Sequence, residues 1–519
     1  MKKAIMITAL LALVALTAIG QTQAPFFHTD SALVRGRIVD YSKEMGFQNL
    51  SAQIANLFTG DLTTASAEIH EDGTFEKRLL LHHPILNWFY TSEAQISKQQ
   101  VPFYLCPGDT LDITIRFRDG GIPECEYKGG HAADVASLMK VRSDYFDVLV
   151  QCRSYDGDIG AYNHFADSLY TMLSDKVEKT ADKYHFTPFE RRLAQCDMTA
   201  SFGNAYLGYF GQIQNRMAQD DPAAPYKAGN AMMERLSQPD TYPLLKRLPN
   251  EDSLMLATKA FQHYLNSLEF SAPFRYPLFA KRGMTWGNDR SEVVENLTLL
   301  RNAGRQLFSS ESDVLPIQLL NLHCLNEAIG EWLEMGTAEE DFRAVQPFLT
   351  HPAIRSMAQH LFDEQADEEA TLPLPTGVAA DFVRDILALY PNRYIILDFW
   401  AMWCAPCKAE IQATKDFRRR LRGRSDIKLV FLANESHPDR KDYLDFVREH
   451  LEGEENIAID DNRLHQLQDL FGFNALPFNV TLTPDGRIVR DGLQLRAAEA
   501  GYDNFISIFE EMKAEIGGN

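Results

Sequence analysis

The stretch YIILDFWAMWCAPCKAE, residues 394–410, decides the fold of the C-terminal part of this chain. Residues 394–400 are apolar or aromatic except for Asp398, which predicts a strand buried on both faces, as in a parallel sheet covered by helices. A helix is expected to begin at the cysteines, since Cys404 and Cys407 stand one helical turn apart. Unpaired N–H groups and the helix dipole favour a negative thiolate at such an N-terminus. The stretch therefore indicates redox chemistry.

Strands and helices alternate around this stretch, and a hairpin follows them. The expected helices are Asp381–Tyr390, Lys408–Leu421 as the continuation of the helix opened by the cysteines, Arg440–Leu451, Arg463–Phe471 and Tyr502–Ile516. The expected strands are Tyr394–Trp400, Ile427–Ala433, Asn456–Ile459, Phe478–Leu482 and Arg487–Arg490. This order predicts a central mixed sheet with helices on both sides.

The residues before this α/β region fall into two parts with different patterns. From 26 to 130, apolar–polar alternation and turn signals, such as Asp72-Gly73, predict a small antiparallel β-sandwich. From 131 to 370 the apolar period becomes that of amphipathic helices, which predicts a helical middle domain. A charged, Pro-punctuated linker leads to the redox domain, expected over 376–519. The expected fold class is a multidomain α+β protein.

The first 24 residues have the layout of a secretory signal. Lys2 and Lys3 precede an uncharged run that ends at Gly20, and small residues there offer cleavage positions, with Ala24 as a second option. The alternative is an uncleaved N-terminal anchor, although the run is short for spanning a bilayer. We therefore expect export to the periplasm or cell envelope, with membrane contact only through such an anchor.

Composition narrows the class of partner. Hydrophobic residues make up 45% of the 519 residues, as in ordinary globular proteins. The formal charge of -21 repels phosphate backbones and anionic lipid surfaces, so nucleic acid is not expected as a partner.

Seven cysteines are present, five of them outside the redox motif. Cys152, Cys196 and Cys324 lie on helical apolar stripes and are interpreted as core residues. Cys106 and Cys125 could form a structural disulfide, but two buried thiols are the favoured interpretation. We see no metal-ligand spacing among the cysteines, and we expect neither a metal nor a cofactor other than the redox-active pair.

Cys404 is the expected nucleophile, because its place at the helix N-terminus lowers a thiol pKa. Pro406 fixes the turn and lacks a donor that the first helical turn does not need, and Cys407 is the expected resolving thiol. An inert disulfide or half a zinc site is the competing interpretation. Asp398 is costly in an apolar strand unless it accepts a proton or finds partners. The basic run 418–422 is interpreted as a solvated helix end.

The motif Trp403-Cys-Ala-Pro-Cys-Lys408, with Asp398 six residues before its first cysteine and Leu476-Pro477 before a hairpin strand, resembles the thioredoxin fold. Within that fold the last quarter of the chain is similar to the exported TlpA/ResA-like thiol-disulfide oxidoreductases. The region 26–130 resembles the sandwich that precedes thioredoxin domains in Bacteroides-type bacteria. The chain departs from the group in lacking its usual proline after the motif and in having a helix where the group often has a hairpin.

The resemblance implies roles for several residues. Asp398 would help to deprotonate the buried cysteine, and Glu410, which matches the group's glutamate, would tune it; the alternatives are a solvated strand-end carboxylate and an exposed helix glutamate. Pro477 is expected to be cis and next to the sulfurs, where the backbone of Leu476 can pair with a substrate strand. Trp403, Ala405 and Pro406 would border the docking surface, with Trp403 over the thiol, whereas Trp400 is expected in the core.

The sequence therefore predicts an exported thiol-disulfide oxidoreductase that exchanges disulfides with protein thiols or disulfides and with an upstream redox partner. A thiol peroxidase is one alternative. A ligand- or partner-binding envelope protein with an accessory redox domain is another. The dipeptide between the cysteines leaves the redox direction open.

Overall fold

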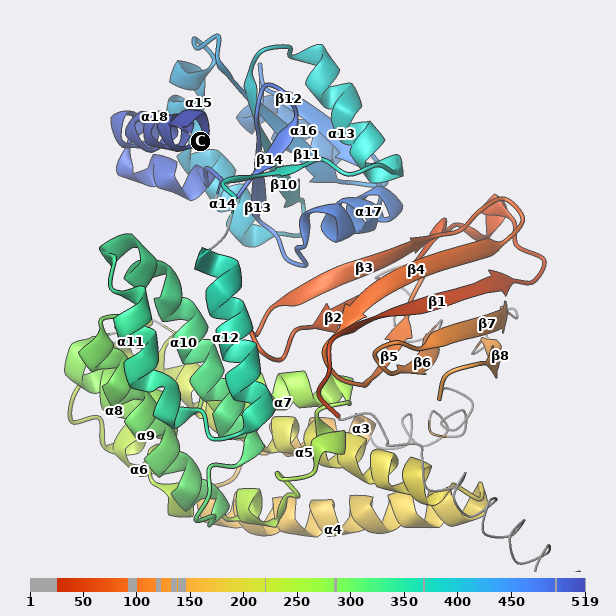
Figure 1. Ribbon diagram of the computed structural model, residues 1–519, viewed down its shortest axis with the longest axis vertical. Helices are drawn as coiled ribbons and strands as arrows, with labels where there is room; N and C mark the ends of the chain where they lie inside the picture. The colour runs from red at the N-terminus through yellow and green to blue at the C-terminus, as the bar shows by residue number, and fades with distance from the viewer. Residues whose placement is uncertain are drawn as a thin grey trace, which may run out of the picture.

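The computed structural model describes residues 26–518, except 92–99, 118–122, 132–137, 139–145, 220, 284–286, 367–368 and 491. The expected signal segment and the anchor alternative lie outside the described residues. Figure 1 shows a β region, a helical region and a C-terminal α/β region, so the expected fold class is confirmed. None of the described helices is long and apolar enough to cross a membrane.

The β region is a sandwich with one shared core. One sheet has the strand order β4 (Thr74–Leu81), β1 (Asp30–Ile38), β7 (Thr110–Arg116), β8 (Glu124–Lys128). The other side consists of two pairs, β2 (Asn49–Ala55) with β3 (Leu62–Glu68) and β5 (Ile85–Phe89) with β6 (Val101–Leu105). A bridge between Ser51 and Tyr90 joins the two pairs. Apolar side chains from both sides fill the core.

One strand pair of the sandwich differs from the antiparallel pattern expected. Strands β1 and β7 run parallel, with Val34 opposite Leu111, because the chain crosses the other side of the sandwich between them. Alternation along a strand reports which side chains are buried but not the direction of its neighbour. The hairpin at Asp72-Gly73 is confirmed, since Ile69 and Phe75 form an antiparallel bridge on either side of it and Gly73 has a φ of 81°.

The middle region is helical, as expected. Its helices are α3 (Phe146–Arg153), α4 (Ile159–Lys183), α5 (Pro188–Met217), α6 (Ala231–Leu236), α7 (Lys259–Glu269), α8 (Ala272–Arg282), α9 (Arg290–Phe308), α10 (Leu315–Met335), α11 (Ala338–Val345) and α12 (Pro352–Ala366). Cys152, Cys196 and Cys324 are buried in their common core, which confirms that interpretation.

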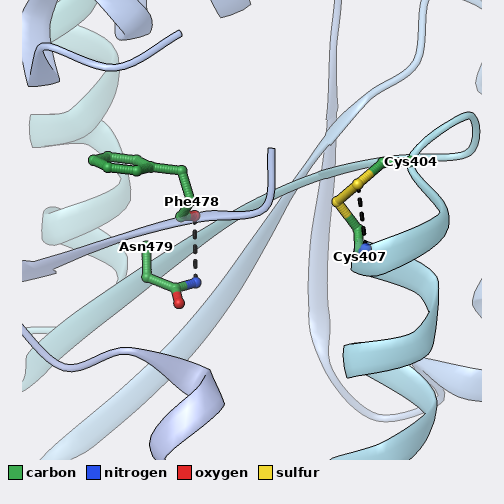
Figure 2. The surroundings of a disulfide bond; sticks show 4 residues. All are labelled: Cys404, Cys407, Phe478 and Asn479. Carbon is green, nitrogen blue, oxygen red and sulfur yellow. Dashed lines mark hydrogen bonds between the residues drawn. A yellow bond between two sulfur atoms is a disulfide. The ribbon is translucent and has the colours of Figure 1, made fainter. Parts of the chain in front are cut away.

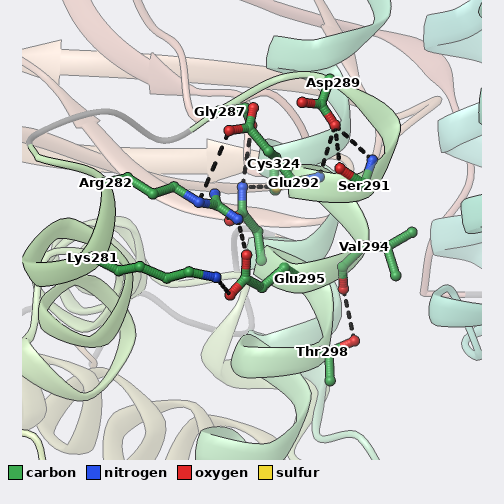
Figure 3. Close-up of polar contacts among 11 residues, drawn as sticks. Lys281, Arg282, Gly287, Asp289, Ser291, Glu292, Val294, Glu295, Thr298 and Cys324 are labelled. Carbon is green, nitrogen blue, oxygen red and sulfur yellow. Dashed lines mark hydrogen bonds and ion pairs between the residues drawn. The ribbon is translucent and has the colours of Figure 1, made fainter.

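Polar contacts fix the junction between α8 and α9 (Figure 3). The carboxylate of Asp289 caps α9 by accepting hydrogen bonds from the N–H groups of Ser291 and Glu292 at 2.8 and 3.1 Å. Glu295 of α9 pairs with Lys281 at 2.8 Å and with Arg282 at the end of α8. These contacts join the C-terminal end of α8 to the first turns of α9.

The C-terminal region is an α/β domain around a six-stranded sheet. Its strand order is β12 (Glu455–Ile459), β11 (Ile427–Asn434), β10 (Tyr394–Ala401), β13 (Phe478–Leu482), β14 (Arg487–Val489), β9 (Thr371–Pro373). The helices are α13 (Val378–Leu389), α14 (Ala405–Ala413), α15 (Lys415–Leu421), α16 (Lys441–His450), α17 (Asp461–Phe471) and α18 (Tyr502–Gly518). Helices α13 and α17 cover one face, and α14, α15, α16 and α18 cover the other.

Two details differ from the expected elements. The helix after the cysteines is interrupted at Thr414, whose hydroxyl donates to the carbonyl of Glu410 at 2.7 Å, so α14 and α15 are separate. Strand β9 pairs with β14 at the sheet edge, upstream of the expected domain start at 376. The linker therefore contributes a strand to the redox domain, and three residues bounded by Pro-rich sequence are too short to be recognised as a strand.

The α/β domain rests on the sandwich through α17, which packs against β3 (Figure 1). The Lys77 ammonium lies 2.7 Å from a carboxylate oxygen of Asp469. The Tyr90 ring contacts the ring of buried His465 edge to face, with centroids 5.6 Å apart. The sandwich therefore contacts the domain that carries the two cysteines.

Candidate redox site

The cysteine pair lies where β10 ends and α14 begins. Cys404 is the N-cap of α14, and its sulfur accepts a hydrogen bond from the N–H of Cys407 at 3.2 Å (Figure 2). The two form a disulfide with Cα atoms 5.4 Å apart. Both cysteines are buried, whereas Ala405 and Pro406 between them are exposed. The exposed surface next to the disulfide therefore includes this dipeptide.

The segment 476–477 enters the sheet beside the cysteines. Strands β10 and β13 are antiparallel, and Phe399 opposite Phe478 is the last pair before β10 runs on to the redox motif. Pro477 precedes this pair, so it lies at the same end of the sheet as the cysteines. The peptide bond between Leu476 and Pro477 is cis, as expected. Leu476 packs on the apolar cluster that contains both cysteines.

A groove of about 730 Å³ opens next to the motif. Apolar and charged side chains of the α/β domain line it, among them Met402, Trp403, Lys408 and Leu476, and the sandwich contributes Gln53. Trp403 is 70% exposed at this groove; that its ring covers the thiol stays a prediction. Trp400 is buried and its indole N–H donates to Asn456 at 3.0 Å, which confirms its place in the core.

Asp398 is buried in the middle of β10, on the face that α14 and α15 cover. Burial raises the pKa of its carboxyl well above the usual value, and the negative charge of Glu410 raises it further. The positive charge of Arg418 and a hydrogen bond with Asn479 act in the opposite direction. The alternative of a solvated strand-end carboxylate is therefore wrong.

Glu410 is half-buried on α14, and its charge acts on Asp398. Glu410 is therefore not fully exposed, and its role in tuning the site stays a prediction. Glu410 thus lies near enough to Asp398 for its charge to oppose ionisation of that carboxyl. Burial and this negative charge both favour the protonated carboxyl, and a pKa perturbed in this way is typical of groups that exchange protons.

The sequence interpretation missed two residues of this environment. Arg418, expected in a solvated helix end, is 1% exposed and donates to the carbonyls of Ile411 and His450, both at 2.6 Å. Asn479 lies opposite Asp398 across the β10–β13 pair. A polar residue within the apolar strand Phe478–Leu482 was a usable signal for Asn479. No comparable signal distinguished Arg418 from the arginines that follow it.

The other five cysteines, all in the part of the chain that the structure describes, form no disulfide. Cys106 and Cys125 are partly buried free thiols, and burial raises their pKa values to about 12 and about 11. Cys106, Asp109 and His131 approach one another within 4.8 Å, a grouping that their spacing in the sequence did not indicate. Asp109 accepts a hydrogen bond from the Cys106 N–H and pairs with His131, contacts that account for the grouping.

Comparison with known proteins agrees with the fold of this domain. Residues 392–488 match the family model described as thioredoxin-like, so the redox motif lies in a thioredoxin-like domain. No curated protein matches the chain. Among solved structures, a protein of Bacteroides vulgatus described as a thiol-disulfide oxidoreductase is 24% identical, with 24% of this chain and 78% of that chain covered and a TM-score of 0.21.

Two further solved structures also resemble part of the chain. A secreted disulfide oxidoreductase of Mycobacterium tuberculosis is 15% identical, covering 23% of this chain and 85% of that one, with a TM-score of 0.19. A thioredoxin-like protein of Bacteroides caccae is 14% identical, with 41% of this chain and 82% of that chain covered and a TM-score of 0.22.

Proposed function

We propose that this chain is an exported thiol-disulfide oxidoreductase of the TlpA/ResA-like kind that exchanges disulfides with protein substrates. The observation that carries the proposal is the Cys404–Cys407 disulfide at the N-terminus of α14, reached through an exposed dipeptide. Export rests on the signal-like segment 1–24 of the sequence. The substrates are protein thiols or disulfides, and an upstream redox partner restores the pair.

In the reducing direction the reaction begins with both cysteines as thiols. The Cys404 thiolate attacks one sulfur of a substrate disulfide, which forms a mixed disulfide and releases one substrate thiolate. Cys407 then transfers its proton to Asp398, and the resulting thiolate attacks the Cys404 sulfur. The second substrate thiol leaves, and the Cys404–Cys407 disulfide forms. The upstream partner supplies two electrons to reduce it, and oxidation of a substrate runs through the same steps in reverse.

Each of the remaining site residues serves one of these steps. Glu410 tunes the proton acceptor Asp398 through its charge. The backbone of Leu476 next to Pro477 pairs with an extended substrate segment, while Trp403 borders the groove that receives it. No metal or cofactor besides the cysteine pair takes part.

The thiol peroxidase alternative needs a cysteine whose thiolate is favoured. Among the described free cysteines, burial raises the pKa values of Cys106, Cys125, Cys152 and Cys196, which is the wrong direction for a peroxidatic residue. The binding-protein alternative makes a separate prediction. A partner captured by the chain would then be retained when both motif cysteines are replaced by serine.

The experiment compares Cys404→Ser with Cys125→Ser in reduction of insulin disulfides. The matched control changes a half-buried free thiol outside the motif. We expect the first variant to lose turnover and the control to keep it; undiminished turnover in Cys404→Ser would refute the proposal. A Cys407→Ser variant should accumulate the mixed disulfide, which identifies the substrate. Equilibration of the unmodified protein with glutathione gives the redox potential of the cysteine pair and so the direction of the reaction.

A further inference from the structure

The buried charges beneath the redox motif form a chain that extends beyond Asp398. The side chain of Arg418 is 2% exposed and lies 3.5 Å from a carboxylate oxygen of Glu454, whose side chain is 6% exposed. Arg422 approaches the same carboxylate at 3.7 Å but is itself 42% exposed. Arginine rarely lies this deep without a specific set of partners, because an unpaired buried charge is costly.

The interruption between α14 and α15 positions this arginine. One guanidinium nitrogen of Arg418 donates to the Ile411 carbonyl at 2.6 Å and to the Thr414 hydroxyl at 2.7 Å. A second nitrogen donates to the carbonyl of His450 at the end of α16, at 2.6 Å. The guanidinium therefore satisfies carbonyls at two helix ends and is held in one orientation.

The same arginine lies over the face of the sheet that carries Asp398. Its guanidinium carbon is 5.4 Å from the centre of the Phe431 ring. Phe431 of β11 is the register partner of Asp398 in β10, so the two side chains stand next to each other on one face. Arg418 thus contacts the immediate neighbour of the buried carboxylate.

We propose that Arg418 is a positioning residue for the redox site: its buried guanidinium favours the ionised form of Asp398, and Glu454 limits how strongly it does so. The effect of this pair on the reaction rests on the proposed function, in which ionised Asp398 accepts the proton of Cys407. It adds to that function a pair of residues, Arg418 and Glu454, that sets the pH at which the resolving step runs.

The charges around Asp398 make the direction of each effect definite. Glu410 on α14 opposes its ionisation, whereas Arg418 on α15 and Asn479 on β13 favour it. Around Arg418, burial lowers the pKa of the guanidinium, Glu454 and Asp398 raise it, and Arg422 lowers it. Loss of Arg418 should therefore raise the pKa of Asp398. Loss of the Glu454 charge should lower it, because Arg418 then acts without a competing carboxylate.

The test titrates Asp398 directly in the oxidised full-length protein, so it needs no enzymatic activity. Protein labelled with [13C]aspartate gives a carboxyl resonance for Asp398 that is identified by its loss in Asp398→Asn. We expect the titration to move up by about one pH unit or more in Arg418→Met and down in Glu454→Gln. Arg418→Lys keeps the charge and should stay closer to the unmodified protein.

Arg419→Met is the matched control, because Arg419 is the next residue and its side chain is 71% exposed. Its titration should equal that of the unmodified protein. A change in the same direction in Arg418→Met and Glu454→Gln, or none in either, overturns the inference. If Arg418→Met fails to fold, Glu454→Gln decides alone, and a titration that does not move down overturns it.

The consequence for the reaction is measured separately. In single turnovers with a disulfide-containing protein, the pH profile for resolution of the mixed disulfide should follow the Asp398 titration in each variant. The rate of attack by Cys404 should remain unchanged. If the unmodified protein exchanges no disulfides at all, the proposed function fails while the titration result stands, so the two failures are distinguishable.

Discussion

Replacing Asp398 by asparagine should stabilise the oxidised redox domain and slow the resolution of the mixed disulfide. The carboxyl is 2% exposed, and burial raises its pKa well above the usual value. From about pH 4 upward the unfolded chain has released this proton while the folded chain still holds it. The unfolded state then binds fewer protons, so Asp398 lowers stability as pH rises until the folded-state pKa is reached.

The size of the gain follows from the cost of the buried group. A buried ion costs several kcal/mol, of which Arg418 and Asn479 recover a part while Glu410 adds to the cost. The isosteric amide in Asp398→Asn carries no charge, so we expect about 1–3 kcal/mol of added stability at pH 8. This corresponds to a roughly 5- to 150-fold smaller equilibrium population of the globally open domain.

Hydrogen exchange measured by mass spectrometry on peptides from β10 and β11 provides the assay, because it reports on this domain alone within a multidomain chain. The protection gained in Asp398→Asn should be large at pH 8 and small at pH 4. Resolution of the mixed disulfide should slow by about 100-fold or more, since the proton acceptor is lost. Faster exchange at pH 8, or a larger gain at pH 4, would refute the reasoning.

Three further predictions concern the scaffold. Gly36→Ala should destabilise the sandwich by about 1–3 kcal/mol in thermal unfolding, because a Cβ there would lie 2.0 Å from the carbonyl oxygen of Ile113. Asp469→Asn should weaken the docking of the redox domain by about 1 kcal/mol, since it leaves partly buried Lys77 unpaired; faster exchange in α17 with unchanged exchange in α10 is the expected readout. Trp400→Phe removes a buried indole hydrogen bond and should cost about 1–3 kcal/mol in denaturant unfolding of the redox domain.

Much of the redox domain follows from local patterns in its sequence. Apolar runs of strand length, helical periods and turn residues lie close together along the chain, so each element is visible in its own residues. The strand Phe478–Leu482 is found at the expected residues, and the cis bond at Pro477 is confirmed. Cys404 and Cys407 required no tertiary information to be paired, because one helical turn separates them.

The electrostatic environment of the site depends on residues that only folding brings together. In the sequence Arg418 does not differ from the other arginines of its basic run. In the fold it is buried between the helix break at Thr414 and the end of α16, and it donates hydrogen bonds to both. Its proximity to Asp398 arises from packing of a helix on a sheet, which no spacing in the sequence encodes. The burial of a residue depends on every element that packs around it, whereas sequence periodicity describes only the element to which the residue belongs.

The direction of β7 beside β1, the strand β9 in the linker and the contact of α17 with β3 likewise involve partners distant in the chain. The sequence by itself determined the elements of the redox domain, its cysteine chemistry and the succession of a β region, a helical region and an α/β domain. Tertiary structure decided which charges surround Asp398. It also decided that Gln53 of the sandwich lines the groove next to the cysteine motif. The physical reason is that long-range packing, and not local pattern, sets the dielectric and the charges around a buried group.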